Sequence, residues 1–259
     1  MENKITVPTT WKQLTESQLT FVSCLLLTGN TETELLTKAF CRFAGIRVIR
    51  HYRGVWICTR KRFGTFMLHD WEITDFLQHV SFLMKGVQEI TPLEKLRRKK
   101  HIDSRLQGTP FRQYLACENY YQAFLHTKNE YYLRCLAASF YLGRRRFNDA
   151  KTARRSNHFK RVSPEELYTV FLWYSGLKEV FAKSFPHFFE RTTLMEGQPA
   201  PVPNMREQIN RQIRALHGGD ITKLKAVQET DTWQALDELD AKAHEAKICN
   251  PLNPPQRDF

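Results

Sequence analysis

The first 45 residues show helical spacing of apolar positions twice, and each stretch carries its own start and stop signals. Leu19, Val22 and Leu25 fall on one face of the first stretch, which begins after Thr15. The second stretch begins after Thr31 with the same kind of spacing. Each threonine is followed three residues later by Gln or Glu, which completes a capping box, and each stretch ends near a glycine. These signals predict two short helices joined as a helical hairpin.

The period changes over residues 46–68, where Val, Ile, Trp and Phe are frequent and Gly54 and Gly64 interrupt the run. β-Branched and aromatic residues favour strands, and glycines favour the turns between them. We therefore predict two or three short antiparallel strands. Helical spacing returns after Asp70, which we expect to cap the next helix. Residues 1–90 are predicted to form a small α+β unit.

Beyond this unit the pattern is helical. Apolar positions predict helices at about 111–126 and 130–142, and Ser163 opens a further helix with a capping box. Residues 91–194 are accordingly predicted to form a basic, aromatic-rich helical domain. The expected fold class is α+β but mostly α-helical. An N-terminal helical hairpin with a small antiparallel sheet should precede a helical bundle and a C-terminal helical extension.

The C-terminal part of the chain divides into three segments of different composition. Three prolines within residues 195–204 predict an extended linker, and residues 249–259 contain too much proline for a helix and are expected to form a loose tail. Between them, residues 205–248 have the spacing of amphipathic helices. These helices can pack on the rest of the chain or on an apolar helix of another protein. The candidate partner-contact residues are Ile209, Ile213, Leu216, Trp233, Leu236 and Leu239.

Positive charge is concentrated in the middle of the chain. The net charge is +12, and residues 91–162 carry 17 basic and 5 acidic residues, which accounts for the whole excess. Residues 143–161 alone hold eight Lys or Arg residues and one carboxylate, on Asp149. Such a stretch can be a solvated connector, a docking strip for an acidic protein, or a contact for nucleic-acid phosphates. The candidate contact residues are Arg144, Arg145, Arg146, Lys151, Arg154, Arg155, Lys160 and Arg161.

No set of residues with the spacing of a known catalytic motif accompanies this charge. The chain lacks the glycine-rich phosphate loops and the nucleophile elbow of hydrolases. Residues 158–161, HFKR, match the HxxR pattern of tyrosine recombinases, but no tyrosine follows Tyr174 to act as the nucleophile. The six cysteines show no CxxC spacing, so we expect inert, reduced thiols and no metal or other cofactor. We predict a protein that is not an enzyme.

The apolar stretches are all short. The longest, at residues 21–27, falls far below the ~20 residues that span a bilayer. The polar start of the chain does not match a secretory signal. We therefore expect a soluble, cytoplasmic protein that does not bind membranes.

Several stretches resemble uncharacterised prophage-encoded proteins from tail-assembly regions, near the tape-measure gene. They are WKQLTESQL at 11–19, TETELLTKAFCRFAG at 31–45, FPHFF at 185–189, and the helical segment at 205–245. The resemblance touches both ends of the chain and is weaker through the basic section. Its matching positions are helix caps and apolar residues, so it carries over no functional residue.

This resemblance implies a phage protein that acts in tail or particle assembly in the manner of a tail assembly chaperone. Its partner would be another protein, such as a tail or tape-measure component. The basic section at residues 91–162 favours an alternative, a nucleic-acid-binding accessory protein of a prophage or mobile element.

Overall fold

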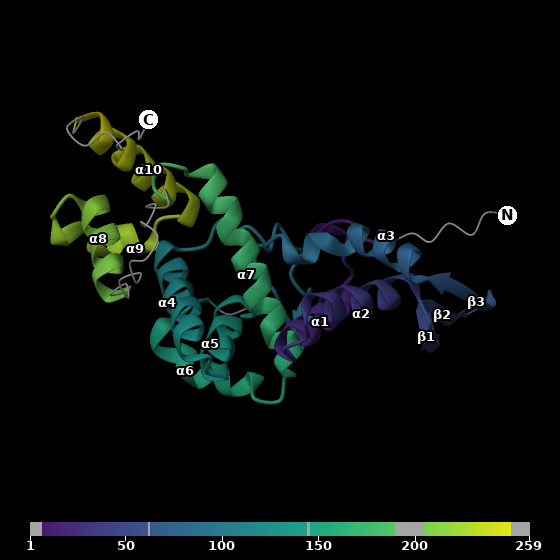
Figure 1. The fold of residues 1–259 in the computed structure, drawn as a ribbon. Coiled ribbons are helices and arrows are strands. Elements are labelled where there is room, and N and C mark those ends of the chain that lie inside the picture. The colour runs from purple at the N-terminus through teal and green to yellow at the C-terminus, as the bar shows by residue number, and fades with distance from the viewer. Residues whose placement is uncertain (1–6, 62, 144–145, 190–204, 250–259) are drawn as a thin grey trace. The chain divides into compact units, whose positions relative to one another are not determined.

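A computed structural model describes residues 7–61, 63–143, 146–189 and 205–249. The chain divides into two compact units, one of residues 1–94 and 162–177 and the other of residues 95–161 and 178–259. The fold is mostly α-helical with a small antiparallel sheet near the N-terminus, which confirms the expected class (Figure 1).

The first unit contains the predicted helical hairpin and sheet. Both capping boxes form: the side chain of Thr15 accepts a hydrogen bond from the Gln18 amide, and Thr31 does the same for Glu34. A left-handed Gly45 ends the second helix. The elements are η1 (Trp11–Gln13), α1 (Glu16–Leu27), α2 (Glu32–Ala44), β1 (Ile46–Tyr52), β2 (Val55–Arg60), β3 (Gly64–His69), α3 (Asp70–Val80), η2 (Ser81–Met84) and the first part of α7 (Pro164–Ser184).

The three strands form one antiparallel sheet in the order β1-β2-β3. The helix after the sheet begins one position earlier than the sequence predicts. His69 is the N-cap, and Glu72 accepts a hydrogen bond from its amide at 2.8 Å, so Asp70 is already the first helical residue. The Asp70 carboxylate is engaged elsewhere, because it accepts a hydrogen bond from Nε1 of Trp56 at 2.5 Å.

Residues 162–177 belong to the first unit, although we expected them in a domain of residues 91–194. Two contacts explain the difference. The buried hydroxyls of Ser23 on α1 and Thr169 on α7 lie 2.8 Å apart. The backbone at Gln88 also crosses α7 at Gly176, where a Cβ atom would lie only 2.1 Å from the Gln88 carbonyl oxygen.

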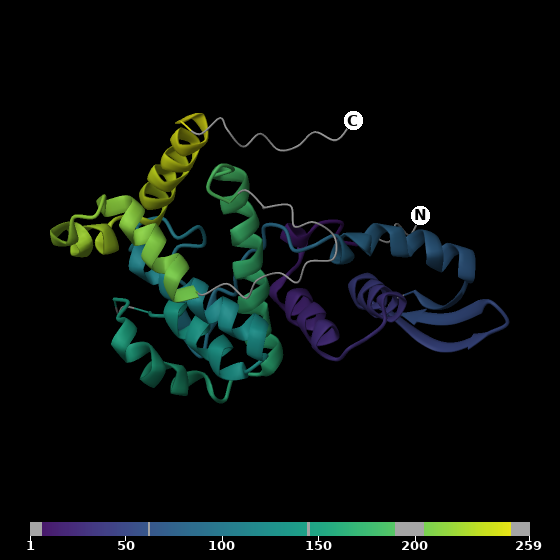
Figure 2. The ribbon, with the colours of Figure 1, turned by 60° about the vertical axis from the view of Figure 1, so that its left-hand side comes forward.

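The second unit is helical apart from one short hairpin. The helices α4 and α5 pack against each other, close to the predicted ranges, and the other helices surround them (Figure 2). Its elements are β4 (Lys95–Leu96), β5 (Lys99–Lys100), α4 (Phe111–Thr127), α5 (Glu130–Phe140), α6 (Asp149–Ser156), η3 (Asn157–Phe159), the end of α7, α8 (Met205–His217), η4 (Ile221–Lys223), α9 (Leu224–Glu229) and α10 (Thr232–Cys249).

The basic stretch at 143–161 is not the solvated loop that we considered. Most of it forms α6 and η3, and Asn148 caps α6 by accepting a hydrogen bond from the Lys151 amide at 3.1 Å. Thr152 and Ser156 are buried along one side of α6. The stretch is therefore a packed helix with one solvent-facing side.

The C-terminal helices pack within the second unit. Thr232, at the start of α10, donates from both its amide and its hydroxyl to the Thr109 carbonyl, at 2.9 and 2.7 Å. Leu236 and Leu239 are buried. The ring of Trp233 lies 5.4 Å from that of Phe181. These three α10 side chains have intramolecular partners, so for α10 the structure favours packing on the chain itself over the alternative of a partner protein.

On α8, Ile209, Ile213 and Leu216 are half-buried. The predicted linker at 195–204 lies outside the described residues. So does the predicted tail, except for Cys249, which ends α10. No helix of the described part of the chain is long and apolar enough to cross a membrane.

Candidate functional site

The solvent-facing side of α6 and η3 is strongly basic. Residues spaced by three and four positions share one face of a helix. Because Thr152 and Ser156 occupy the buried side, the basic residues are directed outward. The two arginines near the end of α6 also suit the negative end of its dipole. This basic face consists of Lys151, Arg154, Arg155 and His158.

The hairpin of β4 and β5 brings further positive charge to this face. Its two-residue turn consists of Arg97 and Arg98, with φ angles of 47° and 64°. Turns of this kind favour glycine or asparagine, because other side chains are strained at positive φ. The buried side chain of Leu96 anchors the hairpin. The turn therefore places Arg97 beside the basic face in a backbone conformation that is strained for arginine.

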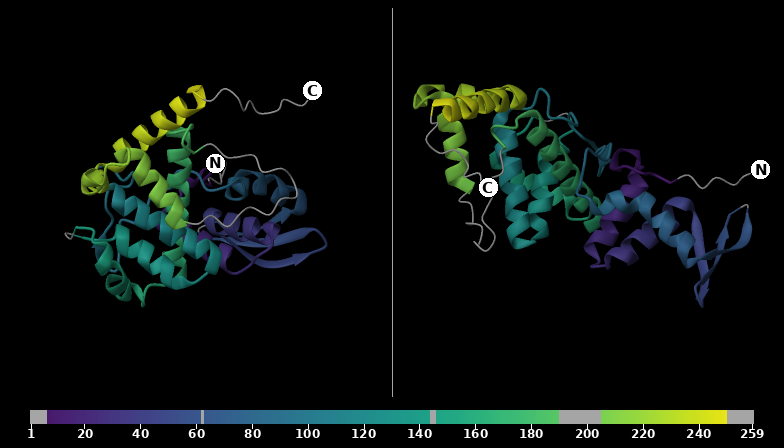
Figure 3. Two further views of the ribbon diagram at one scale, coloured as in Figure 1. Left: turned by 90° about the vertical axis from the view of Figure 1, so that its left-hand side faces the viewer. Right: turned by 45° about the horizontal axis from the view of Figure 1, so that its top comes forward.

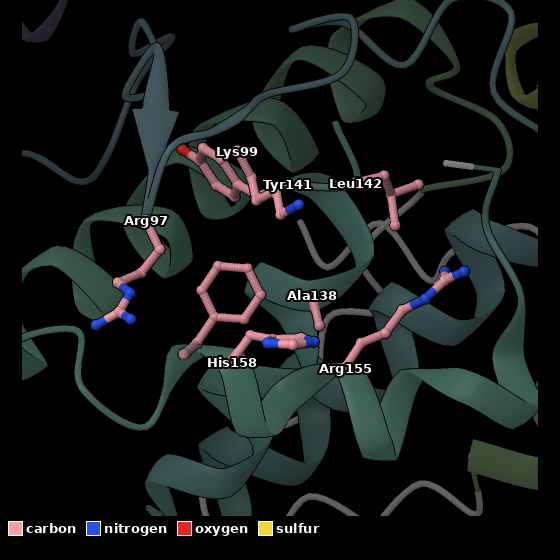
Figure 4. A pocket seen from close by; sticks show the side chains of 8 residues that line it. Arg97, Lys99, Ala138, Tyr141, Leu142, Arg155 and His158 are labelled. Carbon is pink, nitrogen blue, oxygen red and sulfur yellow. The ribbon is translucent and has the colours of Figure 1, made fainter. Parts of the chain in front are cut away.

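A pocket lies between the hairpin and α6–η3. Its volume of about 110 Å³ is several times the ~10–15 Å³ that one ordered water needs. Figure 4 shows Arg97 and Arg155 on opposite sides of the pocket with His158 between them. The lining residues are Arg97, Lys99, Ala138, Tyr141, Leu142, Arg155, His158 and Phe159.

A second hollow of about 310 Å³ lies over the basic face itself and is lined by the four residues of that face. Among the described residues, no carboxylate lines either hollow. The guanidinium of Arg155 donates to the Arg146 carbonyl at 3.1 Å, which fixes its direction. Guanidinium groups bind phosphates and carboxylates through paired N–H donors. The arrangement is suited to binding an anion.

A half-buried histidine supports the wall of the pocket. The ring of His101, just after β5, stacks on Phe140 at 5.8 Å and meets the edge of Tyr141 at 4.9 Å. Its Nδ1 lies 2.6 Å from the Ile102 carbonyl oxygen. Burial lowers the pKa of His101 to about 4. The ring is therefore neutral at pH 7.

This lowered pKa predicts that the second unit loses stability in mild acid. The unfolded chain binds a proton at His101 near pH 6.5, whereas the folded chain resists protonation until about pH 4. The contribution of neutral His101 to the free energy of unfolding is therefore fully present above pH 6.5. It is lost as the pH falls toward 4, which lowers the free energy of unfolding by about 1 to 3 kcal/mol. Urea unfolding of the wild type and of His101→Gln across this range measures the effect. Equal losses in the two proteins would contradict it.

The structure brings together only some of the eight predicted basic contact residues. Three of the eight, Lys151, Arg154 and Arg155, lie on the basic face. Arg146 contributes a carbonyl group, Lys160 and Arg161 are exposed but line neither hollow, and residues 144–145 lie outside the described part of the chain.

Sequence reasoning missed the pocket's apolar lining and three of its four nitrogen-bearing side chains, Arg97, Lys99 and His158. His158 could have been found, because it lies seven positions after Lys151 and continues the same helix face. The position of Arg97 and Lys99 beside α6 could not be predicted from the neighbouring sequence, because only the tertiary fold brings them there.

The cysteines of the described residues form no second site. Cys58, Cys117 and Cys135 are buried, and Cys24 and Cys41 are partly buried. Burial raises the pKa of Cys41 to about 11, which keeps its thiol protonated and unreactive. Within the ranges that the structure describes, no three His, Cys, Asp or Glu residues are placed to hold a metal ion.

Comparisons with protein-family models, curated proteins and solved structures found no match to this chain. The resemblance to prophage tail-assembly proteins therefore stays a prediction. Function has to be argued from the geometry of the site.

Proposed function

We propose that the protein is a non-catalytic, nucleic-acid-binding accessory factor that holds phosphates in the basic pocket of its second unit. The observation that carries this proposal is the convergence of two basic segments around hollows whose described lining residues include no carboxylate. A site of one charge sign attracts a polyanion and concentrates it locally. Nucleic acid is the polyanion whose phosphates suit arginine donors.

The mode of binding follows from which side chains are buried. Phe147 and Phe159, the aromatic residues of the basic stretch, are both buried, so neither can stack on a base. The exposed groups are Lys151, Arg154 and their basic neighbours. Contacts to phosphate carry no sequence information, so we expect binding without sequence preference and with strong salt dependence.

A triple variant, called the pocket variant, tests the pocket together with the hollow over the basic face. Arg97→Asn, Lys151→Gln and Arg154→Gln remove three charges, and asparagine suits the positive φ at position 97. The dependence of log affinity on log salt for a DNA duplex should become shallower by about 0.9 for each lost phosphate contact. Fluorescence anisotropy between roughly 50 and 200 mM salt measures this slope.

A matched control removes three charges from the same unit outside the pocket, as Arg214→Gln, Lys223→Gln and Lys225→Gln. It should keep the wild-type slope. Equal slopes for pocket variant and wild type, or equal losses in pocket variant and control, would count against the proposed site.

Assembly of phage tails through a protein partner is a second candidate function. The observation that favours it is exposed apolar surface on the C-terminal elements, where Ile221 is 79% and Ile248 64% exposed. A tail or tape-measure component could cover such exposed apolar residues, and the half-buried row on α8 offers a further candidate contact. If the wild-type chain bound neither duplex nor single-stranded DNA, this second function would be the better supported.

A further inference from the structure

We propose that the outer face of the β1–β2–β3 sheet is a second nucleic-acid-binding surface, which takes a double-stranded nucleic acid. The proposal shares its ligand class with the proposed function. Its residues, however, all lie in the first unit and none of them lines the pocket.

Charge is the first observation. Residues 46–69, which form the three strands and their turns, contain six Lys or Arg residues and no Asp or Glu. The summed charge of the first 90 residues hides this, because acidic residues of the helices offset it. Arg47, Arg50 and Arg53 are all exposed, and within the described residues none forms an ion pair with a carboxylate. Unpaired charge of one sign favours a polyanion.

The strand register then places two of these arginines on one face. Arg47 lies opposite Thr59, and Arg50 lies opposite Ile57. Two residues three positions apart in a regular strand point to opposite faces. Here the register shifts between Val48 and Arg50, and this bulge brings both arginines to the same side.

This side of the sheet faces solvent, because the other side forms part of the core. Cys58 and Leu68, which alternate with the outer residues of β2 and β3, are buried. On the outer side Met67 is 69% exposed. The strands extend beyond α2 and α3 at one end of this unit (Figure 3). The outer face is therefore exposed along β1 and β3, at Arg47, Arg50 and Met67, and half-buried along β2 between them.

Ring contacts hold the guanidinium groups in place. Arg50 and Arg53 lie over the ring of Tyr52, at 5.4 and 5.1 Å from its centre. Stacking on a ring uses the flat face of a guanidinium and leaves its N–H edges available for phosphate.

The turn between β1 and β2 repeats the feature found at the pocket. It consists of Arg53 and Gly54, both at positive φ, and Arg53 has a φ of 48°. Asparagine or glycine would be less strained there. Arg53 therefore places an exposed positive charge at the tip of the sheet.

The shape of the face favours a duplex. On this face the central strand β2 presents Val55, Ile57 and Thr59, all half-buried, while the long arginines lie along β1 and its turn. A two-stranded β-ribbon, such as β1 with β2, fits the major groove of duplex DNA, which is about 12 Å wide. The half-buried side chains of β2 permit such an approach, and the arginines then reach the phosphates beside the groove.

The test compares two triple variants of the full-length chain. Arg47→Thr, Arg50→Thr and Arg53→Asn remove charge from the sheet while keeping strand and turn preferences. Lys12→Gln, Lys38→Gln and Arg42→Gln remove the same charge from exposed helical positions of the same unit. Affinities for a DNA duplex and for its single strand are measured by anisotropy at several salt concentrations.

We expect the sheet variant to lose roughly tenfold in duplex affinity near 100 mM salt, with a salt slope shallower by about 0.9 per lost contact. The helix variant should stay within about twofold of the wild type, because its charges lie outside the interface. Circular dichroism confirms folding of each protein. If the sheet triple variant does not fold, Arg50→Thr alone replaces it, with a smaller expected loss.

The inference is overturned if sheet and helix variants bind the duplex equally. It is also overturned if the sheet variant loses affinity only for single strands, or if polyglutamate displaces the duplex at equal charge concentration, which would indicate an acidic protein. If the sheet variant loses duplex affinity and the pocket variant does not, the proposed pocket is refuted and the sheet is supported. If only the pocket variant loses duplex affinity, the proposed sheet surface is refuted. If the wild type binds no duplex, both proposals are refuted.

Discussion

Replacing Trp233 with Ala should lower the free energy of unfolding of the second unit by about 3 to 5 kcal/mol, the usual cost of deleting a packed aromatic side chain. The ring packs between Phe181 and Phe185, with both ring centres 5.4 Å away. Its Nε1 also donates to the Arg105 carbonyl at 2.6 Å. The substitution therefore leaves both a cavity and a carbonyl group that has lost a donor.

Differential scanning calorimetry of the full chain measures this loss. Ile221→Ala is the matched control, because Ile221 is also an apolar residue of the C-terminal helical region but is 79% exposed. It should leave the melting temperature nearly unchanged. A Trp233→Ala protein that melted like the wild type would show that α10 does not contribute to the core, and would restore the idea that its apolar face serves a partner.

Replacing Gly176 with Ala should destabilise the first unit, although alanine is normally the better helix former. In an ordinary helix this change stabilises by ~1 kcal/mol. At position 176 the added Cβ would lie 2.1 Å from the carbonyl oxygen of Gln88 and 3.0 Å from its carbon. Both are backbone atoms, so the crossing segment itself has to move. We expect a net loss of about 1 to 3 kcal/mol, as for overpacked cores.

Urea unfolding monitored by circular dichroism distinguishes the two signs. Lys183→Ala, at an exposed position of the same helix, serves as the control and should change stability by less than about 0.5 kcal/mol. A Gly176→Ala protein more stable than the wild type would mean that Gln88 does not cross α7 there.

Much of the first unit could be predicted because its signals are local. A capping box needs only a side chain and an amide three residues apart, and both boxes form as the sequence indicates. The alternation from helix to strand at residue 46 is likewise visible in composition. The incorrect prediction of Asp70 as the N-cap has a nonlocal cause, because the Asp70 carboxylate accepts a hydrogen bond from the indole of Trp56 on β2.

The helix α6 could not be found from apolar spacing, because polar residues form its buried side. Thr152 donates its hydroxyl to the Asn148 carbonyl, and Ser156 donates to the Ala153 carbonyl. Their polar groups are thus satisfied within the helix, which allows burial at little cost. A search for hydrophobic periodicity reads such a segment as a loop.

The sequence by itself determined the helix caps, the strands, the mostly helical class and the excess of positive charge, since each depends on residues close together in the chain. Only the tertiary structure decided three other features. Arg97 and Arg155 line the same pocket, the bulge at Ile49 brings two arginines to one face of the sheet, and the apolar side of α10 packs on its own unit. An amphipathic pattern or a run of charged residues indicates whether a surface favours apolar or charged neighbours. The packing of segments distant in the sequence decides which neighbours it has.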